Sequence, residues 1–229
     1  MDEFLTPAFL TGFITIIGID IILSGDNAVV IALAARSLPE HQQKRAVFWG
    51  AGVAVGLRVA LATIALQVLR LPYLKLAGGA MLLWIAIKLM LPSDEANVEP
   101  AEHLWAAIKT IVVADFVMSL DNVVAVAAAA RGSVTLLAIG LVISIPLVVF
   151  GASMLMRLME RWPVIVTIGA ALLGWTALEM IATDVILEPW FHGMPRYVHY
   201  LFPAAGAIVV VAIGKWFAAR HARRHGSVV

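Results

Sequence analysis

The chain has 229 residues, of which 62% are apolar and 14% are charged, and its mean hydropathy is +0.96. This composition is typical of a multi-pass membrane protein and excludes an ordinary soluble domain. The formal net charge of +1 gives no reason to expect a nucleic-acid partner. The sequence contains no cysteine, which excludes disulfides and thiolate metal ligands.

Seven apolar windows are long enough to cross the hydrocarbon core of a bilayer, which is about 30 Å thick. They cover residues 7–36, 46–69, 72–91, 104–131, 133–157, 162–187 and 197–218. Proline, glycine and charged residues mark the breaks, including the last one at residues 189–195. The first window is too long for a cleaved signal peptide, so we expect it to be retained. The sequence therefore predicts an all-α protein with seven transmembrane helices in a single transmembrane domain over residues 1–229.

Lysine and arginine are unevenly distributed among the segments that flank these windows. Cytoplasmic segments of membrane proteins carry an excess of both residues. The segments on one predicted side hold the larger share, including Arg36, Lys44, Arg45, Arg220, Arg223 and Arg224. This distribution predicts an outside N-terminus and an inside C-terminus.

One polar motif occurs twice inside the apolar windows. The first copy reads DIILSGDN from Asp20 to Asn27, and the second reads DFVMSLDN from Asp115 to Asn122. Carboxylates at this depth in a membrane are costly, and they usually mark a functional site. We therefore predict a polar site within the membrane, built from both copies.

The similarity between the two halves extends beyond the motif. The further matches are Gly50 with Gly140, Pro72 with Pro163, Gly78 with Gly169, Trp84 with Trp175 and Lys88 with Glu179. Each repeat then contains three helices, over about residues 7–91 and 104–187, and the helix at about 197–218 is extra. Because three is an odd number, the second repeat must be inverted relative to the first. Transporters with inverted repeats place their substrate site near the midplane of the membrane.

The spacing within the motif predicts an interruption of the helix. In a straight helix Asp20, Ser24 and Asn27 would share a face, whereas Asp26 would lie about 120° away from Asp20. The two windows that hold the motif are also about 42–45 Å long, more than one straight crossing needs. We predict a break near Ser24–Gly25. By analogy we expect a second break near residues 119–120, although Leu120 replaces the glycine there.

The two copies offer oxygen ligands, which hard divalent cations prefer, so manganese, magnesium and calcium all remain candidates. All six histidines lie in predicted loops or tails, which argues against an imidazole site for zinc, copper or nickel. Met118 either packs in the core or adds a thioether that favours manganese over calcium. Ser24 and Ser119 rank below the Asp and Asn residues as ligands, because serine often bonds back to its own helix.

Four charged residues outside the motif also need an interpretation. Glu179, flanked by apolar residues, is a candidate extra ligand or proton carrier. Arg58 and Lys88 are candidate counter-ions for the motif carboxylates, although Lys88 could instead extend its ammonium group to the membrane surface. Asp184 lies near a predicted helix end, and we expect it to be solvated.

These features together resemble the TerC family of integral membrane proteins. The resemblance rests on the twin D-x-x-x-S-x-D-N motifs, the alanine-rich residues that follow each of them, and the seven-helix length, and it covers essentially the whole chain. It implies manganese export across the cytoplasmic membrane, with manganese as the transported substrate and no organic cofactor. The site residues that it implies are Asp20, Asp26, Asn27, Asp115, Asp121 and Asn122.

The resulting hypothesis is a divalent metal-ion transporter and not an enzyme. One cation would bind between the motif helices, and rocking of the repeats, coupled or not to protons, would expose it to alternate sides. A small-molecule exporter of the amino-acid type is one alternative, and an intramembrane aspartyl protease, which also needs two Asp residues, is another. The expected partners are the divalent ion and the lipid bilayer, and an oligomer is left open.

Overall fold

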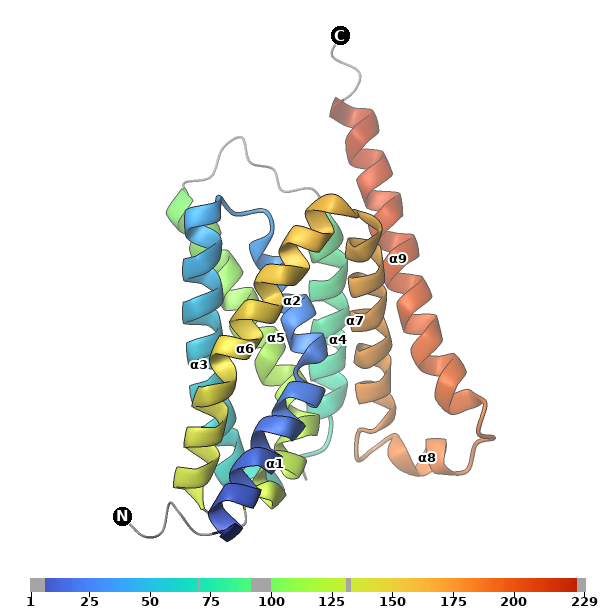
Figure 1. The fold of residues 1–229 in the computed structure, drawn as a ribbon. Helices are drawn as coiled ribbons and strands as arrows, with labels where there is room; N and C mark the ends of the chain where they lie inside the picture. Colours follow the sequence, from blue (N-terminus) through green and yellow to red (C-terminus); the bar gives the residue numbers. More distant parts are fainter. Residues whose placement is uncertain (1–6, 70, 92–99, 131–132, 226–229) are drawn as a thin grey trace. The chain divides into compact units, whose positions relative to one another are not determined.

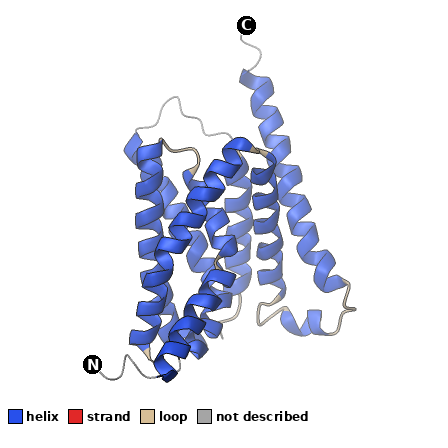
Figure 2. Ribbon diagram, viewed as in Figure 1, coloured by secondary structure: helices blue, strands red, loops and turns tan. Residues whose placement is uncertain are grey.

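The computed structural model describes residues 7–69, 71–91, 100–130 and 133–225, and every regular element in these residues is a helix (Figure 2). In chain order the helices are α1 (Pro7–Leu23), α2 (Gly25–Ala35), α3 (Glu40–Val68), α4 (Leu74–Met90), α5 (Pro100–Ala129), α6 (Val134–Arg161), α7 (Val164–Ala182), α8 (Glu188–His192) and α9 (Val198–His225) (Figure 1). The predicted windows coincide with these helices, the first with the pair α1 and α2. The short helix α8 falls in a segment predicted as a break. Residue 131, the predicted end of the fourth window, lies outside the described residues.

Several of these helices can cross a membrane. Among the described residues, α3, α5, α6, α7 and α9 are long and apolar enough, and the pair α1 and α2, bent by 53° at the break, makes a sixth span if counted as one. Helix α4 has 17 residues and is therefore about 26 Å long, slightly less than the hydrocarbon core. Five or six spans describe a multi-pass membrane protein.

The distribution of side chains agrees with a lipid environment. Large apolar side chains are exposed, with 80% of Ile22, 71% of Phe150 and 70% of Trp105 accessible. Asp20, Arg58 and other polar side chains are buried instead. In water this arrangement would expose much apolar surface, whereas in a bilayer the apolar side chains face lipid and the polar groups are satisfied inside the protein.

The described chain forms two compact units. The first comprises residues 1–70 and 104–156 and holds α1, α2, α3 and most of α5 and α6. The second comprises residues 71–103 and 157–229 and holds α4, α7, α8 and α9. Each unit therefore takes helices from both predicted repeats, so the spatial units do not coincide with the sequence repeats.

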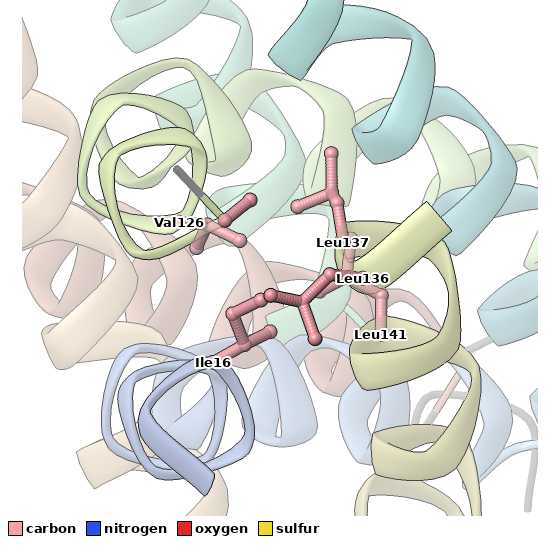
Figure 3. Close-up of a cluster of buried hydrophobic side chains, with 6 residues drawn as sticks. Ile16, Val126, Leu136, Leu137 and Leu141 are labelled. Carbon is pink, nitrogen blue, oxygen red and sulfur yellow. The ribbon is translucent and has the colours of Figure 1, made fainter. Parts of the chain in front are cut away.

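An apolar core joins α1, α5 and α6 in the first unit. Ile16 of α1, Val126 of α5 and Leu137 of α6 are each at most 3% exposed and belong to one cluster with Leu136 and Leu141 (Figure 3). In a bilayer these side chains exchange lipid contacts for protein contacts, so close van der Waals packing and not removal from water stabilises the cluster. This cluster fixes the helices that carry the polar motif.

Two glycines allow the helices of the first unit to approach closely. A Cβ on Gly140 of α6 would lie 2.6 Å from the side chain of Ile16 on α1. A Cβ on Gly50 of α3 would lie 2.8 Å from the side chain of Ile111 on α5. Both isoleucines are fully buried. Each glycine thus provides the space that a large side chain of a neighbouring helix fills.

The second unit packs α7 between α4 and α9 through small residues. A Cβ on Gly174 of α7 would lie 2.5 Å from the carbonyl oxygen of Gly206 on α9. A Cβ on Gly79 of α4 would lie 2.5 Å from the carbonyl oxygen of Ala177 on α7. Backbones that approach this closely have no room for a larger residue, as is common where helices pack in membranes.

Asp184 fixes the start of α4, and the expectation that it is solvated is wrong. The residue is fully buried, and its carboxylate accepts hydrogen bonds from the backbone N–H groups of Tyr73 (3.3 Å), Leu76 (3.0 Å) and Ile186 (3.0 Å). Tyr73 has a left-handed backbone with φ of 65°, which is unusual for a bulky residue. Burial raises the pKa of Asp184, but the backbone hydrogen bonds outweigh it and hold the pKa below its ordinary value.

We expect Gly206→Ala to destabilise the protein, because the new methyl group would collide with the backbone of α7 and force it away. The loss should be about 1–3 kcal/mol, measured as a lower midpoint of thermal unfolding in detergent. Gly151→Ala is the matched control, since a Cβ there meets nothing within 4 Å. A melting temperature of Gly206→Ala equal to that of the control would contradict the close packing of α7 and α9.

We expect Asp184→Asn to lower stability at pH 7 by about 1–3 kcal/mol, because the charged acceptor is lost. A folded-state pKa below the unfolded value means that this stability is present above the unfolded pKa and is lost as the pH falls through the folded pKa. The difference between wild type and variant should therefore shrink between pH 7 and about pH 3. Thermal unfolding at both pH values, with the exposed Glu160→Gln as control, measures it. An undiminished difference at low pH would argue against a charged Asp184.

Candidate functional site

Arg58 of α3 lies between the two copies of the motif. Its Nη1 donates to Oδ1 of Asp20 on α1, and its Nη2 donates to Oδ1 of Asp115 on α5 at 2.6 Å. The three residues are between 1% and 5% exposed. A buried charge is tolerated when it is paired and hydrogen-bonded, and here one guanidinium partly neutralises two carboxylates.

The two serines of the motif complete this arrangement. Ser24 accepts from Nη1 of Arg58 at 3.2 Å and donates to Asp20 at 3.2 Å. Ser119 accepts from Nε of Arg58 at 3.0 Å and donates to Asp115 at 3.2 Å. Arg58 therefore contacts the same two residue types in each copy, and both serines bind side chains instead of only their own helix.

The first copy of the motif contains the predicted helix break. Helix α1 ends at Leu23 and α2 begins at Gly25. An unbroken helix would pair the N–H of Asn27 with the carbonyl of Leu23. Instead the Asn27 N–H donates to Oδ1 of Asp26 at 2.9 Å, and the Leu23 carbonyl accepts from Nδ2 of Asn122 at 3.2 Å. The second copy thus supplies a hydrogen bond to the broken end of the first.

The predicted second break is absent, because α5 runs without interruption from Pro100 to Ala129. Leu120 is 1% exposed and packs as an ordinary core residue of the helix. In the first copy, Gly25 also contributes less to the helix break than the sequence suggests. A Cβ on Gly25 would meet nothing within 4 Å, and its φ is not in the left-handed region. The side chains of Asp26 and Asn122, more than the freedom of Gly25, satisfy the ends of the break.

A small cavity of about 20 Å³ adjoins these residues. Its polar lining consists of Asp20, Ser24, Asn27, Arg58, Asp115 and Ser144. Oδ2 of Asp20 and both side-chain polar atoms of Asn27 are buried and have no hydrogen-bond partner among the described residues. Buried polar groups normally have partners, so these three atoms indicate a place where a polar ligand or water is bound.

The structure brings together only part of the predicted set. Asp20 and Asp115 meet through Arg58, whereas Asp26 is half-buried beside Asn27 and Asp121 is exposed. Within the described ranges, no three Asp, Glu or His side chains lie close enough together to hold a metal ion. Two of the four motif carboxylates therefore converge in this conformation, and a guanidinium lies between them.

The remaining predicted residues lie elsewhere. Met118 is buried in α5 but does not line the cavity. Glu179 is exposed on α7 of the second unit and accepts from Nε1 of Trp175 at 3.1 Å. Lys88, near the end of α4, lies 5.2 Å from the ring centre of the exposed Trp84, as a lysine that extends toward a membrane surface would.

Ser144 of α6 is the site residue that the sequence interpretation missed. It is 1% exposed, lines the cavity and donates to the carbonyl of Leu141 at 2.8 Å. The match of Gly50 with Gly140 could have found it. Four residues after these glycines, Ala54 matches Ser144, and eight residues after them, Arg58 matches Val148. All four residues line the cavity.

The chain is similar to known membrane proteins. The model of the integral membrane protein TerC family matches residues 5–222. The chain is 42% identical over 177 residues to the uncharacterized membrane protein YjbE of Bacillus subtilis, an alignment that covers 77% of this chain and 81% of YjbE. It is 24% identical over 250 residues to the UPF0053 inner membrane protein YoaE of Escherichia coli, covering 100% of this chain but 47% of YoaE. No solved structure matches.

We expect Asn122→Ala to destabilise the protein by about 1–3 kcal/mol, because the Leu23 carbonyl at the break would lose its partner. Thermal unfolding in detergent measures the change. Thr110→Ala is the matched control, since Thr110 lies on the same helix and donates to the carbonyl of Ala106 in its own helix. If both variants unfold at the same temperature, the Asn122 side chain does not stabilise the break.

Proposed function

Because the chain belongs to the TerC family of integral membrane proteins, we propose that it exports a divalent metal ion, manganese in the first place, across the cytoplasmic membrane. The observation that supports this proposal most is the buried polar centre of the first unit. There Asp20 and Asp115 converge on Arg58, beside a cavity lined by the unpartnered side chain of Asn27. Carboxylate and amide oxygens are the ligands that hard divalent cations prefer.

In this proposal the cation binds the motif oxygens that Arg58 leaves free. Asp20 and Asn27 offer unpartnered oxygen atoms for it. Asp26 and Asp121 are the further proposed ligands, and they would complete the shell as the helices rearrange, whereas Asp115 and Asn122 keep the contacts that they make here. Alternating access would carry the ion across, with Glu179 on α7 as the proposed proton-coupling group.

Matched contacts support an inverted repeat behind this mechanism. Gly140 of the second repeat packs on Ile16 of the first, and Gly50 of the first packs on Ile111 of the second. Ile16 and Ile111 each lie four residues before the first Asp of their motif. A two-fold relation between the halves would produce this reciprocal pair of contacts. We propose that α4 completes seven spans, with the N-terminus outside and the C-terminus inside.

The size of the cavity favours a small ion over the alternatives. A volume of about 20 Å³ suffices for a water molecule or a dehydrated ion, since about 10–15 Å³ is the minimum for one water. An amino acid would need a far larger pocket. An aspartyl protease would need its two carboxylates to share a proton and a water, whereas Asp20 and Asp115 are bridged by a guanidinium.

The proposal is tested by uptake of manganese into inside-out membrane vesicles. We expect Asp20→Asn and Asp115→Asn to reduce uptake by about tenfold or more, because the first removes a charged ligand and the second removes the carboxylate that holds Arg58. Glu160→Gln, which changes an exposed carboxylate at the end of α6, should transport normally. Normal uptake by both Asp variants would refute the metal-ion site, and uptake that is absent in the wild type for manganese, magnesium and calcium would refute the function.

A further inference from the structure

The two copies of the motif are alike in sequence but differ in how their polar groups are satisfied. In the second copy, Oδ1 of Asp115 accepts from Arg58 and Oδ2 accepts from Ser119, and the amide of Asn122 donates to Leu23. In the first copy, Oδ2 of Asp20 and both atoms of the side-chain amide of Asn27 have no partner among the described residues. One half of the duplicated centre is complete, and the other half is open.

Arg58 is the origin of this asymmetry. The sequence match places Val148 of α6 at the position that corresponds to Arg58 of α3, and both residues line the cavity. One repeat therefore contributes a fixed positive charge where the other contributes a methyl-bearing side chain. Since the guanidinium spreads its donors over three nitrogens, it reaches Ser119 through Nε, Asp20 through Nη1 and Asp115 through Nη2, whereas a lysine would have to bond all three from a single nitrogen.

We propose that Arg58 is a tethered cation that occupies the Asp115–Ser119 half of the duplicated site, so that the protein binds a single divalent cation at the Asp20–Asn27 half. This inference rests on the proposed function. By a tethered cation we mean a charged side chain that takes the place of a free ion. Asp20 is shared, because its Oδ1 binds Arg58 while its Oδ2 is available. Asn27 is then a ligand, and Asn122 is a structural residue.

The volume of the cavity agrees with one ion and not with two. About 20 Å³ is close to the space that one water molecule needs, and Asp20, Asn27 and Ser144 line it together with Arg58. Two divalent ions would also place four positive charges beside Arg58, against the two converging carboxylates Asp20 and Asp115. A single ion with Arg58 leaves a much smaller excess charge in a low-dielectric interior.

The decisive experiment compares Asn27→Ala with Asn122→Ala in the purified protein. Manganese binding is measured by titration calorimetry, and thermal unfolding is measured without added metal. We expect Asn27→Ala to unfold near the wild-type temperature but to bind manganese about tenfold more weakly, because an unpartnered amide stabilises nothing until it has a ligand. Asn122→Ala should show the opposite pattern, with lower stability and an affinity within about threefold of wild type.

A second experiment measures the number of manganese ions bound per chain and the effect of the Arg58 charge on their affinity. Wild type should bind one manganese ion per chain. Arg58→Gln should bind it about tenfold more tightly, or more so, because a competing positive charge is removed, and Arg58→Lys should stay near the wild-type affinity. The affinities of the Arg58 variants are compared only if these variants elute as monodisperse protein. The comparison of Asn27→Ala with Asn122→Ala does not depend on them.

The outcomes separate the inference from the proposed function. Equal losses of affinity in the two Asn variants, or two ions bound to the wild type, would overturn the asymmetric site while leaving a divalent metal transporter. An affinity that is unchanged in Arg58→Gln would overturn the tethered cation. A wild-type protein that binds none of manganese, magnesium or calcium would overturn both the inference and the proposed function.

Discussion

The ion pairs of Arg58 are the interaction on which the first unit depends. A guanidinium, two carboxylates and two hydroxyl groups lie among apolar helices, where each would be very costly alone. Removal of one partner of a buried ion pair typically costs about 3–5 kcal/mol, because the other charge is left uncompensated. The close packing of Gly50 on Ile111 and of Gly140 on Ile16 brings the helices near enough for one side chain to bridge them. The ion pairs of Arg58 therefore require the same close approach of the helices that the glycines allow.

The structure also shows how a duplicated sequence acquires two different roles. The first copy is interrupted, half-satisfied and open to a cavity, whereas the second lies on a continuous helix and bonds to the end of the first. Two differences between the halves lie at these positions, namely Gly25 against Leu120 within the motif and Arg58 against Val148 outside it. If both copies were interrupted, two sets of unpaired backbone groups would need partners inside the membrane. A continuous second copy avoids that requirement and can supply Asn122 as a partner.

Much of this arrangement could be predicted from the sequence because membranes restrict the choices. Apolar windows predicted the helices, and the doubled motif predicted the break at Ser24 and the buried Asp20 and Asp115, whereas Asp121 is exposed. The wrong expectation of a second break came from treating the copies as equivalent, although the packing of Leu120 was not visible in the motif. Asp184 was misjudged because proximity to a helix end does not reveal that the backbone amides of Tyr73 and Leu76, more than a hundred residues earlier, would bind it. Long-range hydrogen bonds of this kind depend on tertiary packing, which spacing along the chain does not encode.

The position of Arg58 has a consequence for the way the protein is made. An arginine near the middle of a span opposes insertion of its own helix by about 2.5–3.5 kcal/mol. Asp20, its first partner, lies 38 residues earlier in the chain, so it is synthesised before Arg58. Asp115 follows 57 residues later. The order of synthesis therefore lets α3 enter the membrane beside a carboxylate that is already there, and the pair formed by α1 and α3 is then an electrically neutral intermediate to which α5 adds the second carboxylate. The residues that support the function would in this way also guide the assembly of the helices during biogenesis.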